Sequence, residues 1–174
     1  MAYKRSKFFP IFITIIIIVI VIYLFANIEQ TKVKCSKRTT DDLGITVVEE
    51  LNTGLDGKKI TELQLKRSII LPDKYLVDDT YLDYIQYTIE KSYAYLGKKK
   101  VKVSKVNDRV IVYMDLTDNE TIILDNISFG ITDDLTININ SNTKSSDVVT
   151  LKVHDNYTQG ELINHMKNNG YKCG

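Results

Sequence analysis

Residues 58–71 read KKITELQLKRSIIL, in which apolar side chains recur at about every second position. A period of two is typical of a β-strand that buries one face, so this stretch predicts a long strand. Residues 43–51 (LGITVVEEL) predict a second strand, on which Val47 and Glu49 share a face. The turn-forming residues 52–57 (NTGLDG) lie between the two segments. Together these stretches predict an antiparallel hairpin.

Two helices are expected to pack on the sheet to which this hairpin belongs. The first covers residues 78–96, begins at a pair of aspartates and has apolar side chains at helical spacing. The second covers residues 158–168, where Thr158 and Glu161 have the spacing of a capping box. Further period-two alternations predict strands at residues 33–38, 101–106, 109–116, 135–140, 148–153 and 171–173.

The start of the chain has the composition of a membrane anchor. Residues 8–26 (FFPIFITIIIIVIVIYLFA) form an uncharged run of 19 residues, which as a helix would span about 28 Å. The hydrocarbon core of a bilayer is ~30 Å thick. Lys4, Arg5 and Lys7 precede the run, which favours an N-terminus inside the cell. Residues 8–26 therefore predict a transmembrane helix that contacts the lipid bilayer. The alternatives are a cleaved signal peptide and a buried helix of a soluble protein.

This anchor sets the expected domain organisation. We expect residues 1–7 in the cytoplasm, residues 8–26 in the membrane, residues 27–32 as a connector and residues 33–174 as an extracytoplasmic α+β domain. The predicted fold class is α+β, with an N-terminal single transmembrane helix followed by an antiparallel sheet with two packed helices. The predicted localisation is the cell membrane, single-pass, with the N-terminus inside and the C-terminal domain outside.

The chain contains two cysteines, Cys35 near the start of the predicted domain and Cys173 as the penultimate residue. Thiols in an oxidising space tend to pair, so we predict a Cys35–Cys173 disulfide. The two positions are 138 residues apart, and the chain-entropy account allows about 5 kcal/mol for closing such a loop as an upper figure. Two reduced core cysteines and pairing between molecules are the alternatives.

Several short motifs together resemble a known group of bacterial surface proteins. They are Lys34-Cys35-Ser36, a Lys-rich alternating hairpin, the helix from Asp78, the hairpin over residues 101–116, and the ending Asn169-Gly170-Tyr171-Lys172-Cys173. In these motifs the chain resembles the YehR-like lipoproteins of low-GC Gram-positive bacteria. It departs from them in lacking a cysteine placed for lipidation and in a longer region over residues 131–155. The resemblance implies a location and an architecture, and no chemistry.

Histidines beside carboxylates are the one constellation with catalytic potential. Glu161 and His165 are four residues apart on the predicted helix and so share a face, and His154 precedes them. An acid–base or metal site could use all three. A surface helix pair with a strand-end histidine is the commoner meaning of such a pattern, so the sequence predicts no catalytic residue, no cofactor and no metal site. The adjacent carboxylates Asp41-Asp42, Glu49-Glu50, Asp78-Asp79 and Asp133-Asp134 are expected at turns, at a helix start or on opposite strand faces.

Composition bounds the function further. The 174 residues carry 23 Lys and Arg and 22 Asp and Glu, and this balance argues against a nucleic-acid partner. The lysine-rich residues 98–105 could meet anionic lipid or wall polymers, or simply protect a sheet edge. We therefore predict a non-enzymatic binding or interaction module with an unknown protein or cell-wall partner. The alternatives are an envelope enzyme that uses the His/Glu residues and a structural subunit of a membrane complex.

Overall fold

The computed structural model describes residues 14–20, 31–77, 79–94, 97, 100–116, 121–124, 127–131, 137–141 and 149–174. The chain divides into two compact units, residues 1–30 and residues 31–174. Each unit is described by itself.

The first unit corrects the prediction of a membrane anchor. Its described residues, 14–20, are helical. A helix needs about 20 residues to cross a bilayer. None of the helices within the described residues has the length and apolar character for a crossing. The predicted transmembrane helix over residues 8–26 is corrected by this finding, and the rest of that range lies outside the described residues. The predicted single-pass localisation rested on this helix and is corrected with it.

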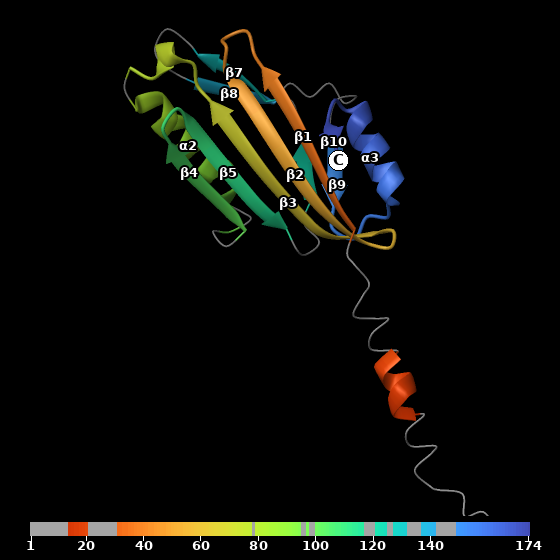
Figure 1. Cartoon of the computed structure of the whole chain (residues 1–174). Helices are drawn as coiled ribbons and strands as arrows, with labels where there is room; N and C mark the ends of the chain where they lie inside the picture. Colours follow the sequence, from red (N-terminus) through yellow and green to blue (C-terminus); the bar gives the residue numbers. More distant parts are fainter. Residues whose placement is uncertain are drawn as a thin grey trace, which may run out of the picture. The chain divides into compact units, whose positions relative to one another are not determined.

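The second unit is built on a six-stranded antiparallel sheet, with strands in the order β10-β1-β2-β3-β5-β4 (Figure 1). Its strands are β1 (Thr31–Thr40), β2 (Thr46–Asp56), β3 (Lys59–Ile70), β4 (Val101–Val106), β5 (Arg109–Leu116) and β10 (Lys172–Cys173). Two smaller antiparallel pairs join β6 (Thr121–Leu124) to β9 (Val149–Lys152) and β7 (Ile127–Ile131) to β8 (Ile137–Ser141).

The long hairpin predicted from residues 43–71 is present, but its turn is shorter than expected. Strand β2 continues to Asp56, so the prediction of a turn over residues 52–57 is wrong. The reversal occurs at Gly57, whose φ of 60° favours glycine. A β-bulge between Gly54 and Leu55 shifts the pairing of β2 with β3 by one residue. The predicted hairpin at residues 101–116 is confirmed, and Asn107 in its turn has a φ of 52°.

Helices cover one face of the sheet. Helix α2 (Thr80–Ser92) contacts β4 and β5, and helix α3 (Gln159–Asn168) contacts β1 and β10 at the other end (Figure 1). A 3-10 turn, η1 (Asp73–Tyr75), precedes α2. The inward side chains of the strands, the buried sides of both helices and those of β6 and β9 form one apolar core. The described part of the chain is thus mostly antiparallel sheet with three short helices, at residues 14–20, α2 and α3, which corrects the predicted fold class.

The two ends of the second unit meet at a disulfide. Cys35 on β1 lies directly opposite Cys173 on β10, with Cα atoms 4.1 Å apart, and the two are bonded. The predicted Cys35–Cys173 disulfide is therefore confirmed. Strand β10 comes immediately after α3, so the bond fixes that helix to the sheet.

The capping box predicted at the start of α3 is also confirmed. The Thr158 hydroxyl accepts a 3.2 Å hydrogen bond from the Glu161 backbone N–H, and Glu161 Oε2 accepts a 2.8 Å hydrogen bond from the Thr158 backbone N–H. A second bond of 2.8 Å runs from the Thr158 hydroxyl to the same carboxylate. Hydrogen bonds from the backbone and side chain of Thr158 lower the pKa of Glu161.

We expect Thr158→Ala to lower the free energy of unfolding by about 1 kcal/mol, which is typical for loss of an N-cap. Glu161 stabilises the fold above its unfolded pKa of about 4.5, and this contribution is lost as pH falls through its lower folded pKa. The difference between wild type and T158A in urea unfolding should therefore narrow between pH 7 and pH 3. Thr150→Ala, on the exposed side of β9, is the control, and a difference that widens in acid would contradict the prediction.

Candidate binding surface on the open face of the sheet

The structure gives the three residues of the suspected acid–base site separate roles. Glu161 is engaged by Thr158 in the capping box. His165 lies on α3 with its ring centroid 5.7 Å from that of Tyr157, and its buried Nε2 has no hydrogen-bond partner among the described residues. His154 lies in the turn after β9, with a φ of 80°. In the described ranges, no hydrogen bond or ion pair joins either histidine side chain to Glu161.

The paired carboxylates also serve the fold. In the described part of the chain, no group of three or more His, Cys, Asp and Glu side chains could hold a metal ion. Asp41 Oδ1 accepts hydrogen bonds of 2.8 and 3.0 Å from two backbone N–H groups of the β1–β2 turn. Glu49 is buried and Glu50 exposed, as expected for neighbours on a strand. Asp78 and residues 133–134 lie outside the described residues.

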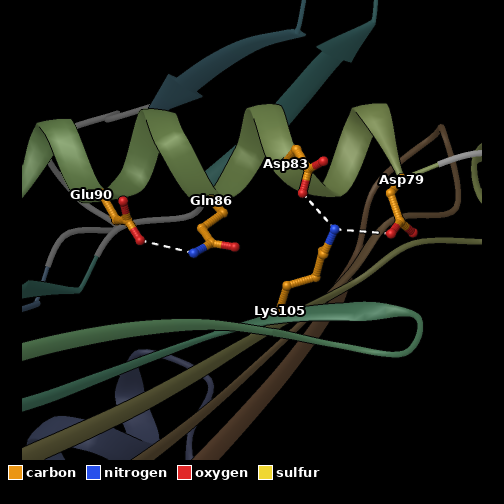
Figure 2. A network of polar contacts seen from close by, with 5 residues as sticks. All are labelled: Asp79, Asp83, Gln86, Glu90 and Lys105. Atoms are coloured by element: carbon orange, nitrogen blue, oxygen red, sulfur yellow. Dashed lines mark hydrogen bonds and ion pairs between the residues drawn. The ribbon is translucent and has the colours of Figure 1, made fainter.

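The lysine cluster over residues 98–105 is divided between the two faces of β4. Lys102 points away from the core, whereas Lys105 points at α2 and lies between two carboxylates (Figure 2). Lys105 Nζ is 3.0 Å from Asp79 Oδ2 and 2.5 Å from Asp83 Oδ1. Hydrogen bonds to Asp83 and Asp79 raise the pKa of Lys105. Lys105 is thus a structural contact between hairpin and helix, and only part of the predicted cluster is available to a ligand. Residues 98 and 99 lie outside the described residues.

This contact gives Asp79 a role other than capping. Of the two aspartates that could cap α2, Asp79 is at the N-cap position but has helical backbone angles and makes no side-chain cap hydrogen bond, and Asp78 lies outside the described residues. The Asp79 carboxylate instead meets Lys105, on the side of the helix that also carries Gln86 and Glu90 (Figure 2). Gln86 Nε2 donates a 2.9 Å hydrogen bond to Glu90 Oε1. This side of α2 is therefore polar and satisfied within the molecule.

The tyrosines near α2 do not form a single platform. Tyr81 packs against Tyr75 of η1, with ring centroids 5.4 Å apart. The hydroxyl of Tyr93 turns into the core and accepts a 3.4 Å hydrogen bond from Arg67. Only Tyr84 and Tyr87 of the described tyrosines on this helix are exposed.

The other face of the six-stranded sheet presents an ordered array of polar side chains. Alternate residues of each strand point away from the core, and the strand register places them in rows across the sheet. One row runs from Lys172 through Ser36, Glu50, Lys66 and Tyr113 to Lys102. Helices α2 and α3 pack on the opposite side, so we call this surface the open face.

The open face is strongly basic. Residues 31–174 contain 20 Lys and Arg and 21 Asp and Glu. The described residues of this unit include 17 of these bases and 14 of these acids. Eight of the described bases and four of the described acids project from the open face, which leaves nine bases and ten acids in the rest of the described unit. The bases are Lys32, Lys34, Arg38, Lys59, Lys66, Lys102, Arg109 and Lys172, and the acids are Glu50, Asp56, Glu62 and Asp115.

Some of these charges are neutralised locally. Lys66 Nζ is 3.1 Å from Glu50 Oε2, Lys32 Nζ is 4.0 Å from Glu62 Oε2, and Asp108 in the β4–β5 turn binds Arg109. Within the described ranges, the remaining bases of the open face make no ion pair, and they are Lys34, Arg38, Lys59, Lys102 and Lys172.

Two hollows mark the β1–β2 side of the open face. One has a volume of about 230 Å³ and is lined by Lys32, Lys34, Asn52, Thr53, Gly54, Glu62 and Gln64. The other has a volume of about 710 Å³ and is lined by Lys34, Cys35, Ser36, Glu50, Leu51, Asn52, Lys172, Cys173 and Gly174. Because both include Lys34 and Asn52, they are adjacent, and we call them together the β1–β2 trough.

A glycine opens one end of this trough. A Cβ placed on Gly54 would lie 2.9 Å from the Cβ of Glu62 and 3.3 Å from its Oε2. Glycine therefore lets the Glu62 side chain lie across β2 toward Lys32 on β1. The absence of a side chain at Gly54 leaves the space that forms the smaller hollow.

Tyr113 and Asp115 form the polar centre of the open face. They are two residues apart on β5 and point to the same side. Burial, and then the charges of Asp115 and Glu62, raise the pKa of Tyr113, so its hydroxyl stays protonated at neutral pH. Asp115 Oδ1 is buried and has no hydrogen-bond partner among the described residues. The pair thus offers one donor and one acceptor beside the bases.

No protein-family model, curated protein or solved structure matches the chain. The resemblance to YehR-like lipoproteins therefore stays a prediction.

The open face was not recognised from the sequence, although its signal is present. On each strand the bases occupy the positions that alternate with the apolar residues, as in Lys32, Lys34 and Arg38 of β1. Summing charge over these outward positions alone, instead of over the chain, reveals the net positive charge of this face. Strand order is needed as well, because it places β10 and its Lys172 beside β1.

Proposed function

We propose that residues 31–174 form a non-enzymatic binding module whose partner docks on the open face. The observation that carries this proposal is that eight bases and only four acids project from the open face, whereas the other described residues of the unit are nearly balanced, with nine bases and ten acids. Such segregation of charge attracts and orients an anionic partner. The resemblance to YehR-like proteins, which implies an architecture without a chemistry, agrees with a binding role. An envelope enzyme is not favoured, since Glu161 is engaged in a helix cap.

Photo-crosslinking tests where the partner docks. A photoreactive residue would replace Ser36 or Ser104, which project from the open face, or Ser92 at the exposed end of α2. When the variants are irradiated in an extract of the protein's own cells, we expect covalent adducts between the protein and its partner from positions 36 and 104 and not from position 92. Adducts from position 92 alone, or from none of the three, would contradict the proposal. The double variant His154→Ala and His165→Ala should keep the same adducts, and their loss would favour the enzyme alternative.

A further inference from the structure

We infer that the β1–β2 trough binds an anionic glycan, meaning a polyhydroxylated chain that carries carboxylate or phosphate groups. This inference rests on the proposed function and adds the position and chemical class of the ligand.

The trough has bases that are not used within the described structure. Lys34 and Lys172 flank Ser36, one on the same strand and one on the neighbouring strand β10. Among the described residues neither lysine forms an ion pair, whereas Lys32 and Lys66 nearby are each paired with a glutamate. Two unpaired ammonium groups around one hydroxyl favour an anionic group between them.

The trough also has neutral groups suited to hydroxyls. Asn52 and Gln64 are directly opposite each other on β2 and β3, and both point out of the open face. Their amides and the Ser36 hydroxyl make no hydrogen bond within the described residues. An amide both donates and accepts, as a sugar hydroxyl requires. A row of amides beside unpaired lysines therefore fits a ligand with hydroxyls and negative charges together.

The lining disfavours two other anionic partners. Single-stranded nucleic acids are held by stacking on aromatic side chains, and no aromatic residue lines either hollow. Protein partners are held mainly by aromatic and other large anchors in desolvated pockets. The only large apolar residue that lines the trough, apart from the disulfide, is Leu51, which is buried in the core. A glycan needs neither feature.

The test measures binding of the full chain to polygalacturonate and to phosphorylated dextran at low salt. We expect binding to at least one of them and none to unmodified dextran. The double variant Lys34→Gln and Lys172→Gln should bind about tenfold more weakly, which is about 1.4 kcal/mol. The matched control removes two exposed lysines from the helices, Lys91→Gln and Lys167→Gln, and should change the affinity less than about twofold. Melting temperatures check that both variants remain folded.

The other outcomes separate this inference from the proposed function. Equal binding to poly-L-glutamate would show that charge alone is recognised and would overturn the glycan assignment. A loss of binding in the double variant Lys66→Gln and Lys102→Gln, without a loss in the trough variant, would overturn the position but keep the open face. If neither glycan binds while Ser36 and Ser104 still give crosslinks, the ligand class is wrong and the proposed function stands. Binding that no open-face variant weakens would contradict both.

Discussion

Replacing Arg67 with Met is expected to lower the free energy of unfolding by about 3–5 kcal/mol, the cost of leaving one partner of a buried ion pair alone. Arg67 on β3 lies directly opposite Glu49 on β2, and their side chains are on the core side of the sheet. Arg67 is 1% exposed and Glu49 is 5% exposed. Without the guanidinium, the Glu49 carboxylate would be buried and uncompensated.

The contacts of this pair explain why the effect should be large. Arg67 Nε donates a 2.8 Å hydrogen bond to Glu49 Oε1, and Nη2 lies 2.5 Å from the same oxygen. The other oxygen of Glu49 accepts a hydrogen bond from the Tyr171 hydroxyl, and Arg67 donates to Tyr93. Tyr93 ends α2 and Tyr171 follows α3, so one ion pair connects the sheet to both helices.

Chemical denaturation of two further variants makes this prediction specific. Lys66→Met, one residue earlier on the exposed side of β3, removes the surface pair with Glu50 and should cost no more than about 1 kcal/mol. The double variant Glu49→Leu and Arg67→Met removes both buried charges and should be more stable than Arg67→Met alone. The prediction fails if Arg67→Met is as stable as Lys66→Met. It also fails if the free energy of unfolding of the double variant falls by the sum of the losses in Glu49→Leu and Arg67→Met.

Removing the disulfide should also be costly, by about 2–5 kcal/mol. The Cys35–Cys173 bond closes a separation of 138 residues and holds the two-residue strand β10 at the edge of the sheet. We expect Cys35→Ser, Cys173→Ser and the double variant to lower the free energy of unfolding equally, because each removes the same bond.

Reductant provides the matched measurement for this bond. Dithiothreitol should destabilise the wild type by the same amount and leave the double variant unchanged. Loss of the bond should first increase amide hydrogen exchange in α3 and β10, because these follow one another and meet the sheet at Cys35. Equal stability of the oxidised and reduced wild type would show that the bond contributes nothing to the fold.

Local patterns predicted much of the sheet and both of its helices. The period-two alternation of β3 and the hairpin of β4 and β5 needed no tertiary information, and the capping box at Thr158 is a local motif. The turn expected over residues 52–57 does not form because β1 and β3 both pair with this segment, and Gly54 within it lies directly opposite Glu62. Residues that favour turns can therefore be held in a strand by the neighbour across the sheet.

The buried ion pair was only partly foreseeable. Glu49 occupies an inward position of β2 between Val47 and Leu51, as the alternation predicts. Arg67 interrupts the inward series between Leu65 and Ile69 in the same way. Two opposite charges at gaps in the apolar series of adjacent strands are a usable signal for a buried pair. Confirming it requires the register, which sequence patterns do not fix.

Lysine acetylation footprinting of the full chain tests the role of the open face most directly. The reactivity of each lysine is compared by mass spectrometry in buffer and in an extract of the protein's own cells. Binding at the open face predicts protection of Lys32, Lys34, Lys66, Lys102 and Lys172, with Lys91, Lys152 and Lys167 still reactive. Protection of the helix lysines while the open face stays reactive, or no protection at any lysine, would contradict it.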